Sequence, residues 1–503
     1  MVKCLLLLVS ATWLASAKDR ICRMGEPEAT CKITGEGCDE KPVTFTPLNL
    51  TVMKWDRDAK KYFSKPAGQL EAHVAVGGKD DWQMYLHGPM FRPWREMRSG
   101  DSMPPFYVQA TFTNKVYRFE QVRKEATRGL PMQAVQKMVA YAEAPSTSFP
   151  IEDKNGTLTG MLVAEGQPFM INAPLDPKHR ELDFGGVDFV SDNCTRIFPN
   201  PIDKKSHYKS GGDVVNTVSC HPYTGICFFS VWKFYDDQSP LWNNMTRKLM
   251  PDCLHYCVAD SLEEMKGGCK KGGVVIDENG EEICSKHGVG AVHGMTVAFG
   301  ENLVHKDPNE FDVFLVFTGG ATFVGGESSM KKVTVKKTDS GDLQVLKCQP
   351  FGRDLFEASV NRTSPTGMAP VDVGGDHAWV DESGKHVWVS TFRYENVGVH
   401  MLDYETGDLI YSVHGTANYL KGNYAYSAGI HGGGWLGHPR GTLLLGTSAC
   451  THPKSACFPA PWNPVDKALG LEAKGLMYVI DLSELLPPAS EGYELPADSG
   501  IIV

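Results

Sequence analysis

The sequence predicts an all-β protein, and a β-propeller in particular. Short β-branched or aromatic runs, such as residues 385–392 and 441–446, alternate with turns rich in Gly, Asn and Asp. Helical patterns are scarce, and two kinds of local sequence unit recur along the chain. Many short strands with frequent turns indicate an all-β fold, for which a β-sandwich joined to a smaller domain is the alternative.

The first recurring unit is a turn followed by a hydrophobic strand. It occurs at residues 221–230, 381–390 and 438–446. The second is an acidic hairpin turn at residues 153–156, 277–280, 339–342 and 404–408, and its last three copies lie about sixty to seventy residues apart. This spacing predicts six to eight blades, with seven favoured, across residues 45–490.

One segment has a helical pattern. Residues 129–141 place apolar side chains at every third or fourth position, and Pro131 stands near the start. We therefore expect one short helix on a β-scaffold.

The N-terminus has the features of a signal peptide. Met1–Lys3 is charged, Cys4–Leu14 is apolar and Ala15–Ala17 offers a small-residue cleavage site. The apolar run is too short to span a bilayer, so we expect no membrane span and a secreted protein. The expected organisation is a signal peptide at 1–17, a Cys-rich segment at 18–44, the propeller at 45–490 and a tail at 491–503.

Glycosylation sequons support export. They lie at Asn49, Asn155, Asn193, Asn244 and Asn361.

The cysteine count also fits an oxidising compartment. Of the 14 cysteines, Cys4 lies in the predicted signal peptide, and the odd remainder leaves at least one thiol unpaired or bonded to another molecule. Local disulfides are expected among Cys22, Cys31, Cys38, Cys253, Cys257, Cys269, Cys284, Cys450 and Cys457. Zinc bound by Cys253 and Cys257 is the alternative.

Composition excludes several classes of function. The net charge of −10 and the pI near 5.9 give no electrostatic footprint for nucleic acid. The chain has no Gly-x-Ser-x-Gly elbow, and the pairs Gly319–Gly320 and Gly325–Gly326 lack a phosphate-loop lysine. A conventional hydrolase or nucleotide enzyme is therefore not predicted.

Four histidines are the candidate metal ligands, because propeller strands surround a central channel on which distant residues converge. They are His221, His293, His377 and His431. Imidazole is a common ligand of iron, copper and zinc, and glycines within two residues of the last three would let the backbone approach a ligand. The alternative is that each histidine hydrogen-bonds a turn carbonyl or a neighbouring strand.

Two acidic features add to the candidate site list. Asp376 beside His377 could orient that imidazole, although adjacent residues on a regular strand point to opposite faces. The turn Asp277–Gly280 could bind calcium, or its Asn-Gly sequence could simply form a tight turn.

Three resemblances follow from these motifs. Residues 374–390, continuing through 399–409, resemble a blade of the YVTN/lactonase-like seven-bladed propellers. The segments His221-Pro-Tyr-Thr-Gly and His293-Gly-Met-Thr-Val are similar to ligand strands of carotenoid oxygenases, which hold iron with four histidines. Propellers of the selenium-binding-protein and methanethiol-oxidase type are similar in outline. These resemblances imply a fold and leave the function open.

Two functions remain in competition. The first is an extracellular metalloenzyme, an oxidoreductase or lyase for a small-molecule substrate, whose axial iron, copper or zinc activates oxygen, water or a substrate bond. The second is a non-catalytic propeller that binds an extracellular protein through loops such as Cys253–Cys284.

Overall fold

The computed structural model describes the strands and the loops that adjoin some of them. The described residues are 23–24, 30–32, 48–56, 61–68, 71–75, 86–91, 106–110, 115–121, 134–142, 145–152, 158–165, 186–191, 194–198, 213–221, 223–233, 253–283, 291–298, 307–318, 330–353, 375–380, 385–391, 397–417, 428–438, 441–450 and 476–481. Within several strands only the backbone is described.

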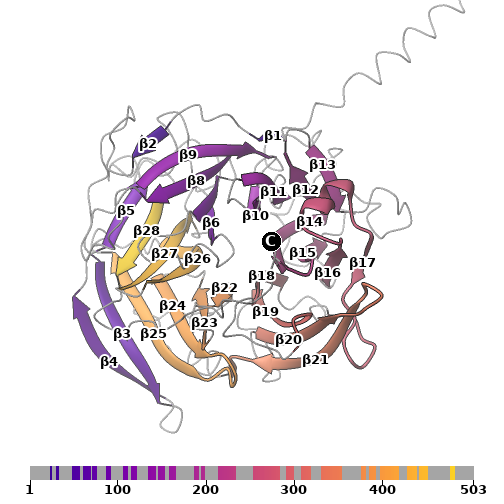
Figure 1. Ribbon diagram of the computed structural model, residues 1–503. Helices are drawn as coiled ribbons and strands as arrows, with labels where there is room; N and C mark the ends of the chain where they lie inside the picture. The colour runs from indigo at the N-terminus through magenta and orange to yellow at the C-terminus, as the bar shows by residue number, and fades with distance from the viewer. Residues whose placement is uncertain are drawn as a thin grey trace, which may run out of the picture.

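The described strands form six antiparallel sheets arranged in a ring, which we call blades 1 to 6 (Figure 1). Blade 1 contains β1 (Arg23–Met24), β2 (Thr30–Lys32), β6 (Leu86–Phe91), β7 (Phe106–Ala110), β8 (Lys115–Gln121) and β9 (Ala134–Tyr141). Blade 2 contains β10 (Pro145–Glu152), β11 (Leu158–Glu165), β12 (Gly186–Val190) and β13 (Cys194–Phe198). Blade 3 contains β14 (Asp213–His221), β15 (Ile226–Lys233), β16 (Cys253–Val258) and β17 (Lys271–Val274).

The second half of the ring is built in the same way. Blade 4 contains β18 (Ala291–Val297), β19 (Glu310–Thr318), β20 (Met330–Lys337) and β21 (Leu343–Phe351). Blade 5 contains β22 (Gly375–Val380), β23 (His386–Thr391), β24 (Val397–Asp403), β25 (Leu409–Ala417), β3 (Leu48–Asp56) and β4 (Lys61–Gly68). Blade 6 contains β26 (Ala428–His438), β27 (Gly441–Cys450), β28 (Leu476–Asp481) and β5 (Glu71–Ala75).

The innermost strands close the ring. They are β6, β10, β14, β18, β22 and β26; each contacts the next, and β26 contacts β6. The predicted β-propeller is thus confirmed, and the described residues form six sheets where the repeat pattern favours seven blades.

Segments from both ends of the chain complete the last blades. The N-terminal strand β5 pairs with the C-terminal strand β28, and β3 adds to the outer edge of β25. The short strands β1 and β2, from the segment predicted as Cys-rich, pair with β9. The domain boundaries themselves stay predictions.

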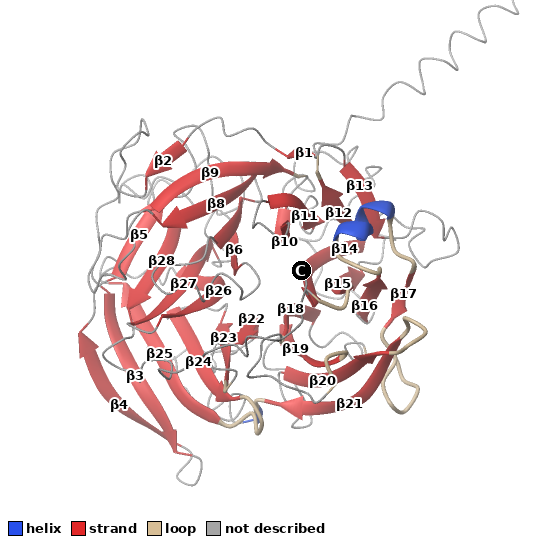
Figure 2. Ribbon diagram, in the orientation of Figure 1, coloured by secondary structure: helices blue, strands red, loops and turns tan. Residues whose placement is uncertain are grey.

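The helix predicted at residues 129–141 is wrong over its described part. Residues 134–141 form β9, which pairs antiparallel along its length with β8. A short apolar run does not distinguish a helix from a strand by periodicity alone, and here sheet pairing overrides the local pattern. Figure 2 shows that the described residues are almost all strand, with the 3₁₀ helix η4 (Glu263–Gly267) beside blade 3.

Several predicted strands and turns are confirmed. The hydrophobic runs at 226–230, 386–390 and 442–446 lie in β15, β23 and β27. Among the acidic turns, those containing Gly280, Gly341 and Gly407 place that glycine at positive φ, a conformation that disfavours residues with a Cβ. Residues 153–156 lie outside the described part of the chain.

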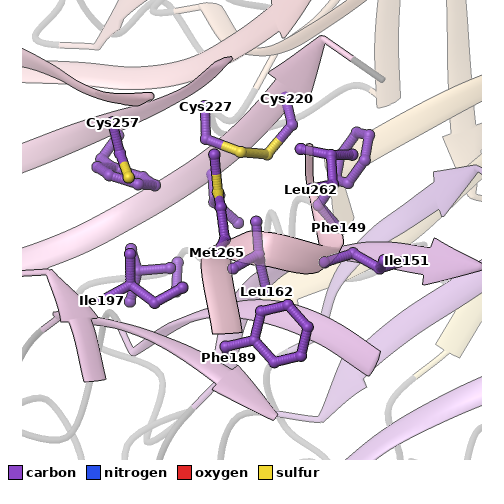
Figure 3. Packing of buried hydrophobic residues seen from close by; sticks show 14 of the residues in the cluster. Phe149, Ile151, Leu162, Phe189, Ile197, Cys220, Cys227, Cys257, Leu262 and Met265 are labelled. Carbon is purple, nitrogen blue, oxygen red and sulfur yellow. A yellow bond between two sulfur atoms is a disulfide. The ribbon is translucent and has the colours of Figure 1, made fainter. Parts of the chain in front are cut away.

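Apolar side chains fill the spaces between blades. In β15, Phe229 faces the cluster shared with blade 2, whereas its neighbour Phe228 faces the cluster shared with blade 4. Alternate residues of a strand point to opposite faces, so a sheet covered on both sides needs apolar residues at consecutive positions. Figure 3 shows the packing between blades 2 and 3, into which Met265 of η4 inserts.

Two disulfides lie in that same packed layer. Cys220–Cys227 joins β14 to β15, and Cys257–Cys269 holds the loop that contains η4 against β16. Cys253 is also disulfide-bonded. Local stapling in this region is therefore confirmed, and disulfide sulfurs at Cys253 and Cys257 rule out the thiolate zinc site considered as the alternative. Among the described cysteines, Cys348 on β21 is free.

The helices in the described part of the chain are all too short or too polar to cross a membrane.

Candidate axial site

Every innermost strand is interrupted by a β-bulge or a similar irregularity in its pairing with the second strand of its blade. The flanking paired residues are His87/Met90, Pro145/Thr147, Val215/Thr217, Val292/Gly294, Gly375/Ala378 and Ile430/Gly433. In β10, β14, β18, β22 and β26 the interruption named here lies in the first half of the strand, and in β6 it lies at the middle. A bulge bends the strand and re-aims a side chain, and such features gather beside active sites.

Three of the predicted ligands occupy these interruptions. His293 lies between Val292 and Gly294, His377 between Gly375 and Ala378, and His431 between Ile430 and Gly433. They belong to the innermost strands of blades 4, 5 and 6, which contact one another in succession (Figure 1). The backbone therefore brings these three residues to corresponding positions around the axis.

The opposite half of the ring carries different residues at the same place. Gly88 and Pro89 lie in the interruption of β6, Ser146 in that of β10 and Asn216 in that of β14. The ring is thus asymmetric, with three imidazole-bearing residues on blades 4 to 6 and small or neutral residues on blades 1 to 3.

His377 is the candidate ligand whose side chain the structure describes. It is 5 % exposed. Its backbone N–H donates to Ser390 Oγ at 3.2 Å, and Ser390 Oγ lies 3.4 Å from the His377 carbonyl oxygen, to which the hydroxyl donates. Ser390 is fully buried on β23, opposite the interruption.

The same contact occurs in blade 3. The Thr217 N–H donates to Ser230 Oγ at 2.9 Å, and Ser230 is fully buried on β15. A buried backbone N–H at or beside a bulge needs an acceptor, which a serine of the second strand supplies in both blades.

Asp376 lies in the same interrupted segment as His377. The expectation that the two residues face opposite ways assumes a regular strand, and a bulge suspends that alternation. The register is therefore compatible with Asp376 beside the axial site.

His221 lies elsewhere. It is the last residue of β14, beyond the interruption between Val215 and Thr217. Its ring stacks on Phe311 with centroids 4.2 Å apart, and its Nδ1 accepts the Thr224 N–H at 3.2 Å. Burial, together with Lys337, lowers the pKa of His221 to about 3. The contacts of this histidine match the structural alternative rather than the role of a fourth axial ligand.

The described residues also bear on metal binding elsewhere in the chain and on the turn proposed for calcium. Among the described side chains, no three His, Cys, Asp or Glu residues are grouped so as to hold a metal, and the side chains of His293 and His431 lie outside that set. In the turn proposed for calcium, Asp277 Oδ1 accepts the N–H groups of Asn279 and Glu281, both at 2.8 Å. These bonds, with the Glu281 N–H foremost, lower the pKa of Asp277. Asp277 Oδ1 is therefore engaged by backbone N–H groups of its own turn, and calcium binding stays a prediction.

The remaining predicted positions are located as follows. Asn49 lies within β3, between β25 and β4, rather than in a loop. Cys31 lies on β2 and Cys450 ends β27. Asn155, Asn193, Asn244, Asn361, Cys22, Cys38, Cys284 and Cys457 lie outside the described residues. Glycosylation stays a prediction.

Sequence reasoning missed the bulges and Ser390, although a signal for the bulges was present. Gly294, Gly375 and Gly433 flank the three interruptions that contain histidine, and a glycine inside a strand pattern marks a bulge. Ser390 ends the hydrophobic run Val387–Val389, where a serine has no local signature of its own.

No protein-family model matches the chain, and no curated protein sequence matches it. Solved structures match only in outline. A hypothetical selenium-binding protein from Sulfolobus tokodaii has 8% identity and a TM-score of 0.35, with 84% of this chain and 86% of that chain covered. A putative 6-phosphogluconolactonase from Bacteroides uniformis has 10% identity and a TM-score of 0.31, with 79% and 89% covered. A nidogen/laminin complex has 9% identity and a TM-score of 0.31, with 73% and 92% covered. At these TM-scores the matches carry no argument about the function of this chain.

Proposed function

We propose that this protein is a secreted metalloenzyme, an oxidoreductase or lyase, whose axial metal is held by His293, His377 and His431. The observation that carries the proposal is the register. Three histidines occupy the pairing interruptions of three consecutive innermost strands, and those strands contact one another.

The donor set fits a transition metal. Three neutral imidazoles suit iron, copper or zinc and leave coordination positions open for a ligand. When bound, such a metal would polarise a substrate bond or activate water or oxygen. The chain's own part would be to supply the three histidines from the innermost strands of blades 4 to 6, and the substrate of such an enzyme would be a small molecule.

Secretion is the second element of the proposal. It is supported by the predicted signal peptide at 1–17, the sequons, and the disulfides Cys220–Cys227 and Cys257–Cys269. A chain that carries such disulfides folds best in an oxidising compartment.

Elemental analysis of the full-length protein tests the metal site. The protein would be secreted by a eukaryotic host and purified without a nickel column, beside a His293→Ala/His377→Ala variant. We expect near-stoichiometric iron, copper or zinc in the wild type and its loss in the variant, whereas a His221→Asn variant should keep it. A correctly folded wild type without metal would contradict the proposal.

A non-catalytic binding propeller is the second candidate. The observation that favours it is the loop around η4, where Glu263, Glu264 and Lys266 are exposed while Cys257–Cys269 and buried Met265 fix the loop to blade 3. Rigidly anchored loops are common interaction sites. A metal-free wild type that retains an extracellular protein, and loses it when Glu263, Glu264 and Lys266 are changed to Ala, would favour this candidate.

A further inference from the structure

Ser390 makes a contact that the metal site does not by itself require. Its hydroxyl lies within hydrogen-bonding distance of both backbone polar groups of His377, the N–H at 3.2 Å and the carbonyl oxygen at 3.4 Å. Both residues are buried, with Ser390 fully enclosed and His377 5 % exposed. A single side chain thus ties the backbone of a candidate ligand to the next strand.

The surroundings of Ser390 make this tie rigid. The residues on either side of it, Val389 and Thr391, pair with Ala378 and Gly375 on β22, so Ser390 stands opposite the interrupted segment. On its other side Ser390 pairs with Val399 of β24, which holds β23 in the middle of the sheet. Regular pairing of β23 with β24 therefore holds Ser390 in place, whereas the β22 segment that its hydroxyl contacts is irregular.

Blade 3 provides an internal comparison. Ser230 pairs with Thr217, the first residue after the interruption, and accepts its N–H at 2.9 Å; it is as deeply buried as Ser390. The interruption of β14 contains Asn216 in place of a histidine. The two serines share the structural task of satisfying a backbone donor at a bulge, and only Ser390 does so beside a candidate ligand.

We propose that Ser390 is a positioning residue for the axial metal, acting through the backbone of His377. By hydrogen-bonding the N–H and the carbonyl of His377, the hydroxyl fixes how the β22 segment bends. It thereby fixes the backbone position of His377, to which the imidazole is attached. Groups that orient a ligand in this way affect metal affinity without touching the metal. This inference rests on the proposed function and deepens it.

The test measures metal affinity and stability separately. Full-length Ser390→Ala, Ser230→Ala, Ser390→Thr and His377→Ala variants would be compared with wild type by chelator competition for the metal found in the wild type, and by thermal unfolding of the metal-free proteins. We expect Ser390→Ala to weaken metal binding by about 10- to 100-fold, the usual effect of losing an orienting group. Ser390→Thr keeps a hydroxyl and should recover most of the affinity.

Ser230→Ala is the matched control. It should lower the unfolding temperature of the metal-free protein to a similar extent as Ser390→Ala and change metal affinity less than twofold. If Ser390→Ala holds metal as tightly as wild type while His377→Ala loses it, the positioning role is refuted and the metal site stands. If both serine variants weaken metal binding equally, the role is general stabilisation and the inference also fails. A wild type without metal overturns the proposed function and this inference together.

Discussion

At the scale of single residues, His221 shows how burial decides the chemistry of an imidazole. The ring lies against Phe311, its Nδ1 accepts the Thr224 N–H, and Lys337 adds an unfavourable charge nearby. Because burial lowers its pKa to about 3 from the ordinary 6.5, the ring stays neutral where an exposed histidine would be protonated.

This shift predicts a pH dependence of stability. As pH falls below 6.5, the unfolded chain binds a proton at His221 that the folded protein does not, so the contribution is complete above pH 6.5 and is lost toward pH 3. The unfolding free energy should fall by up to about 1.4 kcal/mol per pH unit from this group. Urea unfolding at pH 7, 6 and 5 measures the slope.

A His221→Asn variant is the comparison, since Asn offers an acceptor for the Thr224 N–H and does not titrate in this range. Its slope between pH 7 and 5 should be shallower than that of wild type, whatever its absolute stability. Equal slopes would show that His221 takes up its proton in the folded protein at an ordinary pH.

A second residue-scale feature is the charged cluster between blades 4 and 5. Lys332 Nζ lies 3.3 Å from Asp312 Oδ2, Tyr404 Oη donates to Asp312 Oδ2 at 2.7 Å, and Thr334 Oγ1 donates to Asp312 Oδ1 at 2.6 Å. Lys332 Nζ also lies 4.2 Å from the centroid of the Tyr404 ring. Burial and the neighbouring Asp312 raise the pKa of Tyr404, so its hydroxyl remains a donor at neutral pH.

Removing the Lys332 charge from this cluster should lower the stability of the folded protein. Lys332→Met leaves a buried carboxylate without its cation and should lower the unfolding free energy by about 3–5 kcal/mol. Adding Asp312→Asn removes the uncompensated charge and should recover part of that loss. The experiment is urea unfolding of both variants, and a double variant less stable than the single one would show that the pair is not coupled as its geometry implies.

At the scale of elements, innermost strands are joined across blades by hydroxyl groups. Thr147 Oγ1 on β10 accepts the Val218 N–H of β14 at 2.9 Å, and Ser219 Oγ on β14 accepts the Val297 N–H of β18 at 3.1 Å. An innermost strand has no neighbouring strand of its own sheet on the side that faces the axis. The backbone N–H groups on that edge therefore need side-chain acceptors from the next blade.

Thr147→Val tests this role, because it keeps the shape of the side chain and removes the acceptor. Val218 is fully buried, so its unsatisfied N–H should lower the unfolding free energy by about 1–3 kcal/mol. Thr159→Val is the control, since Thr159 is exposed and donates only to the Ile151 carbonyl; its effect should stay within about 0.5 kcal/mol. Equal losses in the two variants would contradict an inter-blade role for Thr147.

Prediction from sequence succeeded for elements with a local signal. The runs around Phe228 and Trp388 were predictable as strands because buried sheets demand consecutive apolar residues. Residues 134–141 were predicted as part of a helix but form β9. Their short apolar run fits the periodicity of a helix as well as that of a strand, and only the pairing with β8 decides between the two. Cys220–Cys227 was missed because the cross-strand register of β14 and β15, not spacing along the chain, makes those cysteines neighbours.

The candidate site was predictable in part for the same reason. Glycines within two residues singled out His293, His377 and His431, which the register then placed at corresponding interruptions. His221 shared the histidine-turn pattern but ends its strand instead, a difference that only strand boundaries reveal. The pairing of Ser390 with the β22 interruption also depends on register, and no local pattern encodes it.

At the scale of the whole molecule, the ring is completed by strands from opposite ends of the chain. Blade 6 takes three strands from the C-terminal part and β5 from the N-terminal part, with Val74 opposite Met477 and His73 opposite Tyr478. Every other blade depends on this closure, because each innermost strand packs between two neighbours. The pairing of β5 with β28 therefore ties the N-terminal part of the chain to the last blade of the ring.

Engineered disulfides across this junction test the closure. Neighbouring pairs in an antiparallel ladder alternate between two geometries, so cysteines at 74 and 477 or at 73 and 478 should include one pair that bonds readily. A bond enclosing almost the entire ring removes much of the entropy of the unfolded chain and should stabilise the protein by several kcal/mol, on the order of 5 by loop closure. Peptide mapping without reductant and thermal unfolding measure both effects.

The control for this junction is a pair one residue out of register, Val74→Cys with Tyr478→Cys, whose side chains a ladder directs to opposite faces. It should form little disulfide and leave the unfolding temperature near that of the single-cysteine variants. Bonding of the out-of-register pair alone would place β5 in a different register on β28. No bonding in any pair would contradict the pairing of β5 with β28.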